Sequence, residues 1–378
     1  MKPVIFAATV WLWGIIALPG CASMPNQTRN AAPATALSAP KPLPAKIVIA
    51  HRGASALRPE HTLEAYAKAI DDGADAIEPD LVITKDGVLV ARHENEISGT
   101  TNVADKPEFA SRKTTKTIDN NRITGWFTED FTLAELQTLR ARERIPANRP
   151  GNTAFNDQFQ VPTLQAIIDL ALRKSVETGR TVAIYPETKH PSYFAAIGLP
   201  FDQRLVDQLH ASGLRGIDAP VFIQSFEVAN LKAMRKLTDV RMVQLLAARG
   251  QPEDFRLAGS SQSYADLASP GGLKQIALYA NGIGPEKSMV IGRTAQGALG
   301  QPSALVRQAK AAGLLVHPYT FRPENPFLPA DLRRGEATSP SARGDMALEI
   351  STFLQTGIDG FFTDDPAVGR AALDGRGK

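Results

Sequence analysis

Three carboxylates in this chain have the types and spacing that could hold a metal ion. Glu78 and Asp80 lie two residues apart in a strand-like run, so their side chains point to the same face. Two carboxylates held side by side repel each other, and a shared proton, a basic side chain or a cation relieves the repulsion. Glu187 ends the next strand-like run, and a parallel barrel would bring it to the same edge. Such a set suits calcium or magnesium better than zinc; pairing with surface cations is the alternative for Glu78 and Asp80 alone.

Two histidines end the apolar runs that flank the carboxylate pair. A single histidine at the end of a strand is more often a structural residue than a catalyst. The chain has only six histidines, however, and His51 and His93 are the two at these positions. Two imidazoles on either side of a cation could act as general base and general acid near neutral pH.

Two basic residues close to these positions could bind an anion. Arg52 follows His51 directly and offers a planar fork that matches a phosphate, and Lys189, near Glu187, offers a point charge. Carboxylates for a metal, cations for an anion and histidines for protons together indicate phosphoryl transfer. A set of purely structural residues would not need all three.

The elements that must position these residues alternate along the chain. Short apolar or β-branched runs are separated by amphipathic segments, which is typical of parallel strands joined by helical crossovers. We predict strands at 46–51, 76–82, 181–187, 221–225, 241–246, 282–284, 314–319 and 360–363, and helices at 62–71, 164–177, 203–211, 227–237, 273–280, 303–312 and 345–355. Eight strands with helical crossovers predict an α/β fold of the (β/α)8, or TIM, barrel type, which keeps its chemistry at the carboxyl ends of the strands.

Three stretches depart from this alternation. Residues 88–93 are strand-like but follow Asp86-Gly87, a strong hairpin signal, so we place them as the return arm of a hairpin that extends the second strand. Residues 94–160 are polar and too long for an ordinary connection, and they predict a small inserted subdomain with its own helix near 133–140. This insertion begins directly after His93, so it should overhang the site. Residues 321–344, with four prolines, predict a rim loop or lid.

The amino-terminal residues predict export. One lysine, an apolar stretch and small residues before Cys21 have the layout of a secretory signal, and the stretch is too short for a convincing membrane span. Leu18-Pro19-Gly20-Cys21 resembles the lipobox of bacterial lipoproteins, in which the cysteine is lipidated. We predict a signal peptide over 1–20, a lipidated disordered tether over 21–45, and a barrel domain over 46–378 that contains the insertion. Plain secretion and an uncleaved anchor are the alternatives.

Composition limits the partners. The formal net charge is +3, and no cluster of lysine and arginine with interleaved aromatics occurs, so nucleic acid is not expected as a partner. Cys21 is the only cysteine in the chain, so it cannot form an intramolecular disulfide. A lone thiol in an oxidising compartment needs another explanation, and lipidation supplies one. The sequence does not indicate an oligomeric state.

The motifs that contain the candidate residues resemble, in order and spacing, those of the glycerophosphodiester phosphodiesterases, and most closely the periplasmic bacterial branch. The resemblance covers nearly everything from residue 47 to residue 366. The motifs are His51-Arg52-Gly53-Ala54-Ser55, Pro59-Glu60-His61-Thr62, Glu78-Pro79-Asp80-Leu81, Thr84-Lys85-Asp86-Gly87, His93, Tyr185-Pro186-Glu187-Thr188-Lys189, Gln224-Ser225-Phe226, Asn281-Gly282-Ile283-Gly284-Pro285, Val316-His317-Pro318-Tyr319-Thr320 and Gly360-Phe361-Phe362-Thr363-Asp364.

The resemblance implies a TIM-barrel enzyme that hydrolyses glycerophosphodiesters, such as deacylated phospholipids, to sn-glycerol 3-phosphate and an alcohol. One divalent cation is expected, with calcium typical of the periplasmic branch and magnesium the alternative. The expected partner is a small-molecule diester, and the membrane is contacted only through the lipid anchor. The resemblance implies acid/base work for His51 and His93, phosphate contacts for Arg52 and Lys189, and metal binding by Glu78, Asp80 and Glu187.

The resemblance also bears on location and on the head group of the substrate. Ala22, rather than aspartate, follows Cys21, which by resemblance to lipoprotein sorting in enteric-type bacteria favours the outer membrane. We expect an outer-membrane lipoprotein facing the periplasm, or a periplasmic protein. Glu94 stands where aspartate commonly follows the second histidine, and residues 98–101 replace the usual Asp-Arg-Thr/Val-Thr run. These departures touch the insertion and concern the choice of head group more than the reaction.

Two other functions stay open. One is a metal-dependent phospholipase that acts on intact lipids, against which the long polar insertion and the absence of an apolar surface loop argue. The other is an inactive, surface-tethered binding lipoprotein, against which the complete set of site residues argues.

Four further residues invite a functional interpretation. His61 is expected at the exposed start of a helix capped by Thr62, with a contact residue near the site, where the resembled family motif places it, as the alternative. Gln224 and His317, at strand ends, are expected to face either the pocket or the core. Trp126 is expected in the core of the insertion rather than against a ligand.

Overall fold

The computed structural model describes residues 41–336 and 339–376. The predicted signal peptide, Cys21 and most of the predicted tether therefore lie outside the described residues. At the start of the described part, Lys41 pairs with the segment before the third barrel strand. Its N–H donates to the Gly179 carbonyl at 3.0 Å, and its carbonyl accepts from the Thr181 N–H at 2.9 Å. Among the described residues, no helix is both long and apolar enough to cross a membrane.

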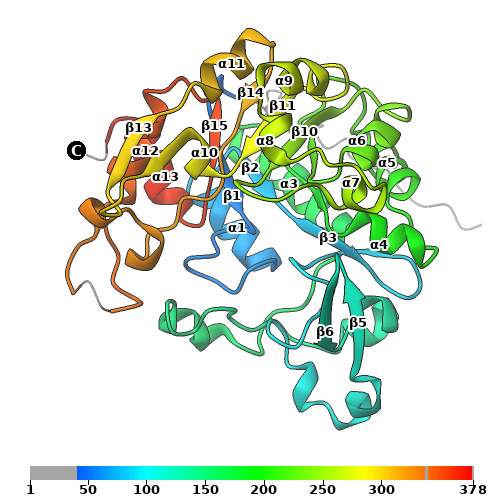
Figure 1. Ribbon diagram of the computed structural model, residues 1–378. Helices are drawn as coiled ribbons and strands as arrows, with labels where there is room; N and C mark the ends of the chain where they lie inside the picture. The colour runs from blue at the N-terminus through cyan, green and yellow to red at the C-terminus, as the bar shows by residue number, and fades with distance from the viewer. Residues whose placement is uncertain (1–40, 337–338, 377–378) are drawn as a thin grey trace, which may run out of the picture. The chain divides into compact units, whose positions relative to one another are not determined.

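Within the described residues, eight parallel strand positions form the body of the fold (Figure 1). Two of these positions are each built from two short segments. In order around the body they are β1 (Ile47–His51), β2 (Ala76–Glu78) with β3 (Asp80–Ile83), β7 (Ala183–Ile184) with β8 (Glu187–Thr188), β9 (Phe222–Ser225), β10 (Arg241–Leu246), β11 (Gly282–Pro285), β14 (Leu315–Val316) and β15 (Gly360–Thr363).

The junction between β14 and β15 closes the barrel. β15 pairs in parallel with β1, and β14 pairs in parallel with β11. Between β14 and β15, the Asp359 N–H donates to the Val316 carbonyl and the Phe362 N–H donates to the Pro318 carbonyl, both at 3.0 Å. The fold is a TIM barrel, as the alternation of strands and helices predicts, and each predicted strand overlaps an observed one.

Proline interrupts the second and third barrel strands at the level of the candidate site. Pro79 separates β2 from β3 and Pro186 separates β7 from β8, because proline has no N–H to donate to the ladder. Both proline carbonyls still accept, from the N–H groups of Glu187 and Gln224 respectively, at 2.9 Å. The register is therefore kept across each break, with Asp80 opposite Glu187 and Glu187 opposite Gln224.

A hairpin extends the second strand, as predicted from Asp86-Gly87. β4 (Leu89–Ala91) runs antiparallel to β3, with Val90 opposite Val82. Gly87 adopts φ +83°, the left-handed conformation that the turn requires. The return arm carries the chain back to the barrel mouth, where His93 follows it.

An aromatic layer fills the barrel directly beneath the site. Tyr185, two residues before Glu187, stacks on Phe222 and meets Phe362 edge-on, with both pairs of ring centroids 5.0 Å apart. The Tyr185 hydroxyl bonds His317 Nδ1 at 2.9 Å. A larger apolar cluster lies between the strands and the surrounding helices. The strands are thus held from both faces, which fixes the side chains at their carboxyl ends.

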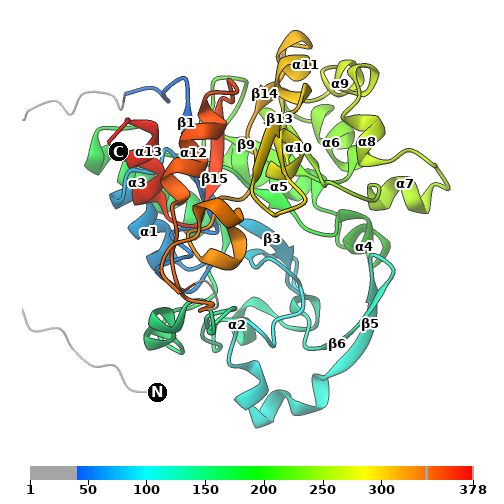
Figure 2. The same cartoon turned by 60° about the vertical axis from the view of Figure 1, so that its left-hand side comes forward.

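Helices surround the barrel (Figure 2). All seven predicted helices overlap observed ones, and Thr62 caps α1 by accepting from the Ala65 N–H at 3.1 Å. The helix after β15 was not predicted. The helices outside the insertion are α1 (Leu63–Asp71), α3 (Leu164–Thr178), α4 (Pro191–Ala196), α5 (Asp202–Ala211), α6 (Val228–Arg235), α7 (Glu253–Leu257), α8 (Tyr264–Leu267), α9 (Pro270–Ile276), α10 (Lys287–Val290), α11 (Leu305–Ala311), α12 (Met346–Leu354) and α13 (Pro366–Leu373).

The stretch 94–160 folds into a layer of its own, drawn in cyan to green below the barrel in Figure 1. Its predicted helix begins as expected but ends early, giving α2 (Leu133–Leu136). A hairpin of β5 (Thr114–Ile118) and β6 (Asn121–Gly125) was not predicted, although its turn residues Asp119 and Asn120 have the positive φ of a two-residue hairpin loop. The layer also contains 3-10 helices at Val103–Asp105, Pro107–Arg112, Thr128–Asp130 and Pro150–Phe155.

The stretch 321–344 follows β14 at the barrel rim, as predicted. It contains 3-10 helices at Asn325–Phe327 and Ala330–Leu332, and a hairpin of β12 (Ile291–Arg293) and β13 (Leu299–Pro302) lies beside it. Arg293 donates to the Phe327 carbonyl at 2.7 Å, and the Leu299 N–H donates to the Asp331 carboxylate at 3.1 Å.

Gly53 sets the path of the chain as it leaves β1, and replacing it should destabilise the fold. Gly53 has φ +87°, and a Cβ there would lie 2.8 Å from the backbone of Ala65 in α1. We expect Gly53→Ala to lower the free energy of unfolding by about 2 kcal/mol or more, through backbone strain and overpacking. Gly99→Ala is the control, because a Cβ there meets nothing within 4 Å. Equal melting temperatures for the two variants would contradict this account.

Candidate active site

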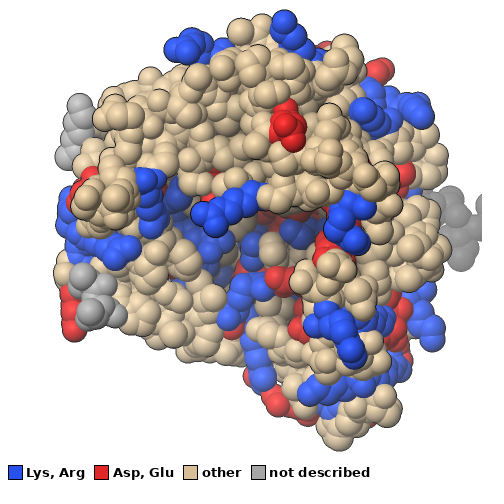
Figure 3. All heavy atoms as spheres, in the orientation of Figure 1, with Lys and Arg blue, Asp and Glu red and all other residues tan. Residues whose placement is uncertain are grey.

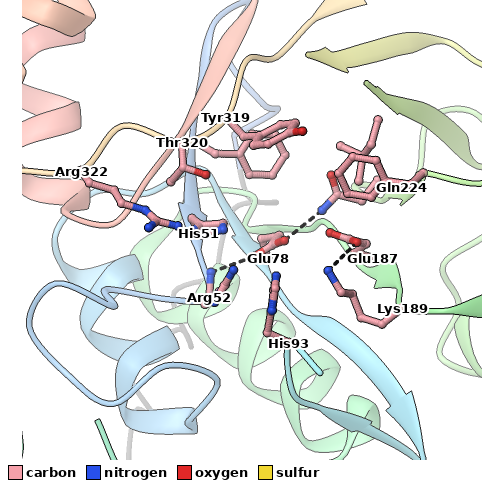
Figure 4. A pocket seen from close by; sticks show the side chains of 13 residues that line it. His51, Arg52, Glu78, His93, Glu187, Lys189, Gln224, Tyr319, Thr320 and Arg322 are labelled. Carbon is pink, nitrogen blue, oxygen red and sulfur yellow. Dashed lines mark hydrogen bonds and ion pairs between the residues drawn. The ribbon is translucent and has the colours of Figure 1, made fainter. Parts of the chain in front are cut away.

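A cavity of about 300 Å³ opens at the carboxyl ends of the barrel strands. Six of the seven candidate site residues line it, and the seventh, Asp80, lies beside them. Figure 4 shows Arg52 and His93 pointing toward Glu78, and Lys189 toward Glu187. The lining residues are His51, Arg52, Glu78, His93, Glu187, Lys189, Gln224, Phe226, Leu245, Tyr319, Thr320, Arg322 and Phe362.

The three carboxylates meet at one point, although Glu187 lies about a hundred residues after the other two. One oxygen from each of Glu78, Asp80 and Glu187 lies within 4.8 Å of the others, and all three residues are buried. Glu78 and Asp80 share a face because they are two apart on one strand. Glu187 joins them because the parallel register places it opposite Asp80.

Burial and mutual repulsion control the ionisation of this triad. Burial, Asp80 and Glu187 raise the pKa of Glu78 well above its usual range. Burial raises the pKa of Glu187 to about 8, with Asp80 adding to the rise and Lys189 opposing it. For Asp80 burial is outweighed by Lys189 and His61, which hold its pKa well below the usual range. A cation between the carboxylates would let all three ionise.

The donor set fits a hard divalent cation. Asp80 Oδ1 is buried and has no hydrogen-bond partner among the described residues, which is the kind of acceptor that a metal ion satisfies. Glu78 is oriented from both sides. Its Oε1 accepts from the Gln224 side-chain amide at 3.0 Å, and its Oε2 accepts from the backbone N–H of Arg52 at 2.8 Å. Such contacts fix a ligand before the metal binds.

The two candidate anion-binding cations lie on opposite sides of the triad. The Arg52 guanidinium contacts Glu60 at 3.0 Å and Asp80 at 3.4 Å, and Arg52 has a left-handed φ of +58°. Lys189 Nζ donates to Glu187 Oε1 at 2.8 Å. Both side chains line the cavity while held by these carboxylates, so an anion between them would meet two fixed positive charges.

His51 is held by a carboxylate from the last barrel strand. Its Nδ1 lies 2.6 Å from Asp364 Oδ1. Since Asp364 is buried beside Arg149 and Arg322, it is ionised: burial opposes this, but the two guanidinium groups hold its pKa well below the usual range. The Nδ1–H of His51 therefore donates to Asp364, which leaves Nε2 unprotonated. Burial and the neighbouring Arg52 lower the pKa of His51 to about 4.

His93 is held in the same way by its neighbour in the sequence. Its Nδ1 lies 2.5 Å from Glu94 Oε1, and Glu94 is partly exposed. Burial, Arg52 and Lys189 lower the pKa of His93 to about 3, so its imidazole is neutral at neutral pH. Glu94, which departs from the family pattern, thus takes the role of an orienting carboxylate.

Sequence reasoning assigned no role to Asp364 and Arg322 and left the position of Gln224 open, and the structure places all three at the site. Asp364 closes the last resemblance motif, but nothing local connects it to His51, 313 residues away. Gln224 faces the cavity and bonds Glu78, which resolves its two alternatives. Arg322, from the rim stretch, lines the cavity and lies 3.3 Å from Asp364 Oδ2.

The remaining three candidates lie outside the cavity lining. The expectation that His61 is exposed was wrong, and the residue instead lies beside the triad, in agreement with the alternative. It has φ +54° and is fully buried, where Nε2 bonds Asp80 at 2.9 Å and Nδ1 bonds the Tyr66 hydroxyl at 2.7 Å. His317 is buried in the core, where its ring packs edge-on against Tyr185 and Phe222. Trp126 lies in the core of the insertion, with its indole N–H donating to the Phe109 carbonyl at 2.7 Å, as expected.

Positive charge gathers around the hollow that leads to the site. Figure 3 shows Lys and Arg along the hollow between the barrel and the inserted layer. Arg52, Lys189 and Arg322 line the cavity itself. A field of this sign attracts an anionic ligand and raises its local concentration.

Comparison with known proteins gives one consistent result. Residues 51–368 match the glycerophosphoryl diester phosphodiesterase family. The chain is 36% identical over 331 residues to the glycerophosphodiester phosphodiesterase GDPD6 of Arabidopsis thaliana, covering 84% of this chain and 82% of that protein. It is 29% identical over 355 residues to a glycerophosphodiester phosphodiesterase of Haemophilus influenzae, covering 87% and 90%. A solved Oleispira antarctica phosphodiesterase, in complex with the product sn-glycerol-3-phosphate, shares the fold with a TM-score of 0.52 and 20% identity, covering 88% and 97%.

The raised pKa of Glu187 makes cation binding dependent on pH. With a pKa of about 8 in the folded protein, the carboxyl is largely protonated at pH 6, and a cation must displace that proton. We expect excess calcium or magnesium to raise the melting temperature of the metal-free protein more at pH 9 than at pH 6. Glu78→Gln should abolish the effect, and Glu108→Gln, on the exposed face of the insertion, should preserve it. A cation effect that is equal at both pH values would contradict a triad site.

Proposed function

The chain belongs to the glycerophosphoryl diester phosphodiesterase family, and we propose that it hydrolyses glycerophosphodiesters to sn-glycerol 3-phosphate and an alcohol, with His51 and His93 as the acid/base pair. The observation that carries this proposal is the meeting in one cavity of a carboxylate triad, two anion-binding cations and two histidines. Each histidine has its Nδ1 on a carboxylate. The product bound to the Oleispira antarctica phosphodiesterase is the product proposed for this chain.

The anionic phosphodiester binds between Arg52 and Lys189, whose positions on either side of the triad favour it. Arg52 donates a hydrogen bond to Glu60, which already fixes its side chain. Little conformational entropy is therefore lost when Arg52 contacts the phosphate. A divalent cation at Glu78, Asp80 and Glu187, calcium in this proposal with magnesium the alternative, would neutralise developing charge on the phosphoryl oxygens.

The two histidines move protons through their Nε2 atoms. One neutral imidazole accepts a proton from the nucleophile, which is water or the glycerol 2-hydroxyl, as the new P–O bond forms. The other imidazole must first take up a proton at Nε2 from water when the anionic substrate binds, and it donates this proton to the departing alkoxide as the old P–O bond breaks. The carboxylates on Nδ1 stabilise each imidazolium while it carries the extra proton. One histidine gains a proton and the other loses one, so a proton exchange with water returns the pair to its starting state.

Replacing either histidine should stop the reaction without unfolding the protein. We expect His51→Ala and His93→Ala to lower kcat for release of sn-glycerol 3-phosphate from glycerophosphocholine by about 10²-fold or more. His210→Ala is the control, since His210 bonds Thr238 at 3.0 Å and does not line the cavity. Circular dichroism and the melting temperature report on folding. Full turnover in either site variant would refute the acid/base assignment.

The same assay separates this function from its two alternatives. Wild-type release that is lost with a chelator and restored by calcium or magnesium supports metal-dependent hydrolysis. Absence of release with calcium present would favour an inactive binding protein, and faster turnover of intact phosphatidylcholine than of glycerophosphocholine would favour a phospholipase.

For location, we propose an exported lipoprotein of the outer membrane that faces the periplasm. The support is the signal-like 1–20 stretch and the lone Cys21. In a Gram-negative host, labelled palmitate should appear on the wild-type protein and be absent from Cys21→Ser, which should move to the soluble fraction. Equal labelling of both proteins would contradict lipidation at Cys21.

A further inference from the structure

Two arginines of the inserted layer reach the carboxylates that hold the two histidines. Arg144 and Arg149 lie on either side of a tight turn, in which the N–H groups of Asn148 and Arg149 both donate to the Ile145 carbonyl, at 2.9 and 3.0 Å. The turn is fastened to the loop after β1, because Arg149 and Asn152 both donate to the Ser55 carbonyl, at 2.8 and 3.0 Å.

Arg149 holds the carboxylate of His51. Its Nη2 donates to Asp364 Oδ2, while Asp364 Oδ1 accepts from His51 Nδ1. On the other side, Arg149 Nε donates to Glu324 Oε1 at 2.7 Å. All four side chains in this chain of contacts are at least nine-tenths buried. The inserted layer, the rim stretch and the last barrel strand therefore meet at the group that orients His51.

Arg144 holds the carboxylate of His93. Its Nη1 and Nη2 donate to the two oxygens of Glu94, at 2.9 and 2.7 Å, and Glu94 accepts from His93 Nδ1. Nε and Nη2 of the same guanidinium also donate to Glu60 Oε1, at 2.8 and 2.7 Å, and Glu60 in turn holds Arg52. Arg144 thus reaches both His93 and a candidate phosphate ligand through one carboxylate each.

We propose that Arg144 and Arg149 are positioning residues, through which the inserted layer fixes the tautomer and orientation of both histidines. Arg144 holds Glu94 through two N–H groups, and Glu94 Oε1 faces His93 Nδ1. Arg149 holds Asp364 through Oδ2, which leaves Oδ1 to accept the Nδ1–H of His51. This directs both Nε2 atoms to the cavity. The catalytic consequence rests on the proposed function, whereas the orienting contacts themselves do not.

The geometry separates this role from mere attachment of the layer. Without Arg149, Asp364 keeps Arg322 as a neighbouring cation, but the buried Glu324 loses its ion-pair partner. Without Arg144, Glu94 is partly exposed and can be solvated, and Glu60 keeps Arg52. Arg149→Lys leaves a positive charge beside Glu324 and is therefore the variant least expected to unfold the protein, and melting temperatures check the folding of the methionine variants.

Kinetics provide the first part of the test. We expect Arg149→Met to lower kcat for glycerophosphocholine about 10–100-fold with little change in KM, and Arg149→Lys, which keeps a charge without the fork, to recover part of the loss. Arg144→Met should lower kcat and also raise KM, because Glu60 would lose the guanidinium that fixes its Oε1 and could shift together with Arg52. Arg142→Met is the control: Arg142 pairs with Asp105 and Asp157 within the layer and touches neither orienting carboxylate. A loss in Arg142→Met equal to that in Arg149→Met would overturn the proposal.

The second part reads the histidines directly and needs no turnover. In protein labelled with 15N-histidine, the ring nitrogens of His51 and His93, assigned through their alanine variants, should show a protonated Nδ1 and an unprotonated Nε2. Arg149→Met should alter the signals of His51 more than those of His93, and Arg144→Met should alter those of His93 more than those of His51. Unchanged signals in both variants would overturn the positioning role even if His51→Ala is inactive. Selective changes combined with an active His51→Ala would instead refute the proposed acid/base function and leave the orienting contacts in place.

Discussion

The repulsion between three buried carboxylates is the constraint on which the rest of the site depends. Two unit charges about 4 Å apart interact by about 4 kcal/mol at an effective dielectric constant of 20, so Glu78, Asp80 and Glu187 cannot all be ionised without compensation. Three residues supply part of this compensation, each by a direct contact with one carboxylate of the triad. They are Lys189 at Glu187, His61 at Asp80 and the backbone N–H of Arg52 at Glu78. A shared proton or a divalent cation must supply the remainder, and the unpartnered Asp80 Oδ1 favours a cation.

The barrel provides the stiffness that this repulsion requires. Pro79 and Pro186 remove N–H donors beside the triad, yet their carbonyls keep the parallel register, so the carboxylates cannot drift apart along the strands. The aromatic layer around Tyr185 packs directly beneath them. Because the carboxylates cannot move apart, burial and then their mutual repulsion raise the pKa values of Glu78 and Glu187.

Local patterns predicted the barrel side of the site, but not what holds it. A period of two places Glu78 and Asp80 on one face, and the strand–helix alternation predicts that Glu187 meets them, because both rules depend on short stretches of sequence. The roles of Asp364 and Arg149 were not predicted, because Asp364 lies 313 residues from His51 and Arg149 lies 215 residues from Asp364. A polar insertion also has no periodicity to indicate which arginine turns inward. His61 was placed at the surface because a helix start is usually exposed, whereas its left-handed backbone turns the ring under Asp80.

The positive charges that we propose to bind the substrate would also determine when a histidine can act as an acid. Without an anion, burial, Arg52 and, for His93, Lys189 lower the pKa values of His51 and His93 to about 4 and 3, so both imidazoles are neutral and ready to accept protons. A phosphodiester bound between Arg52 and Lys189 cancels part of that positive field, which raises both pKa values. The orienting carboxylates then favour the imidazolium form. In this proposal a histidine can donate a proton only when the substrate is bound. Without substrate, both histidines are neutral.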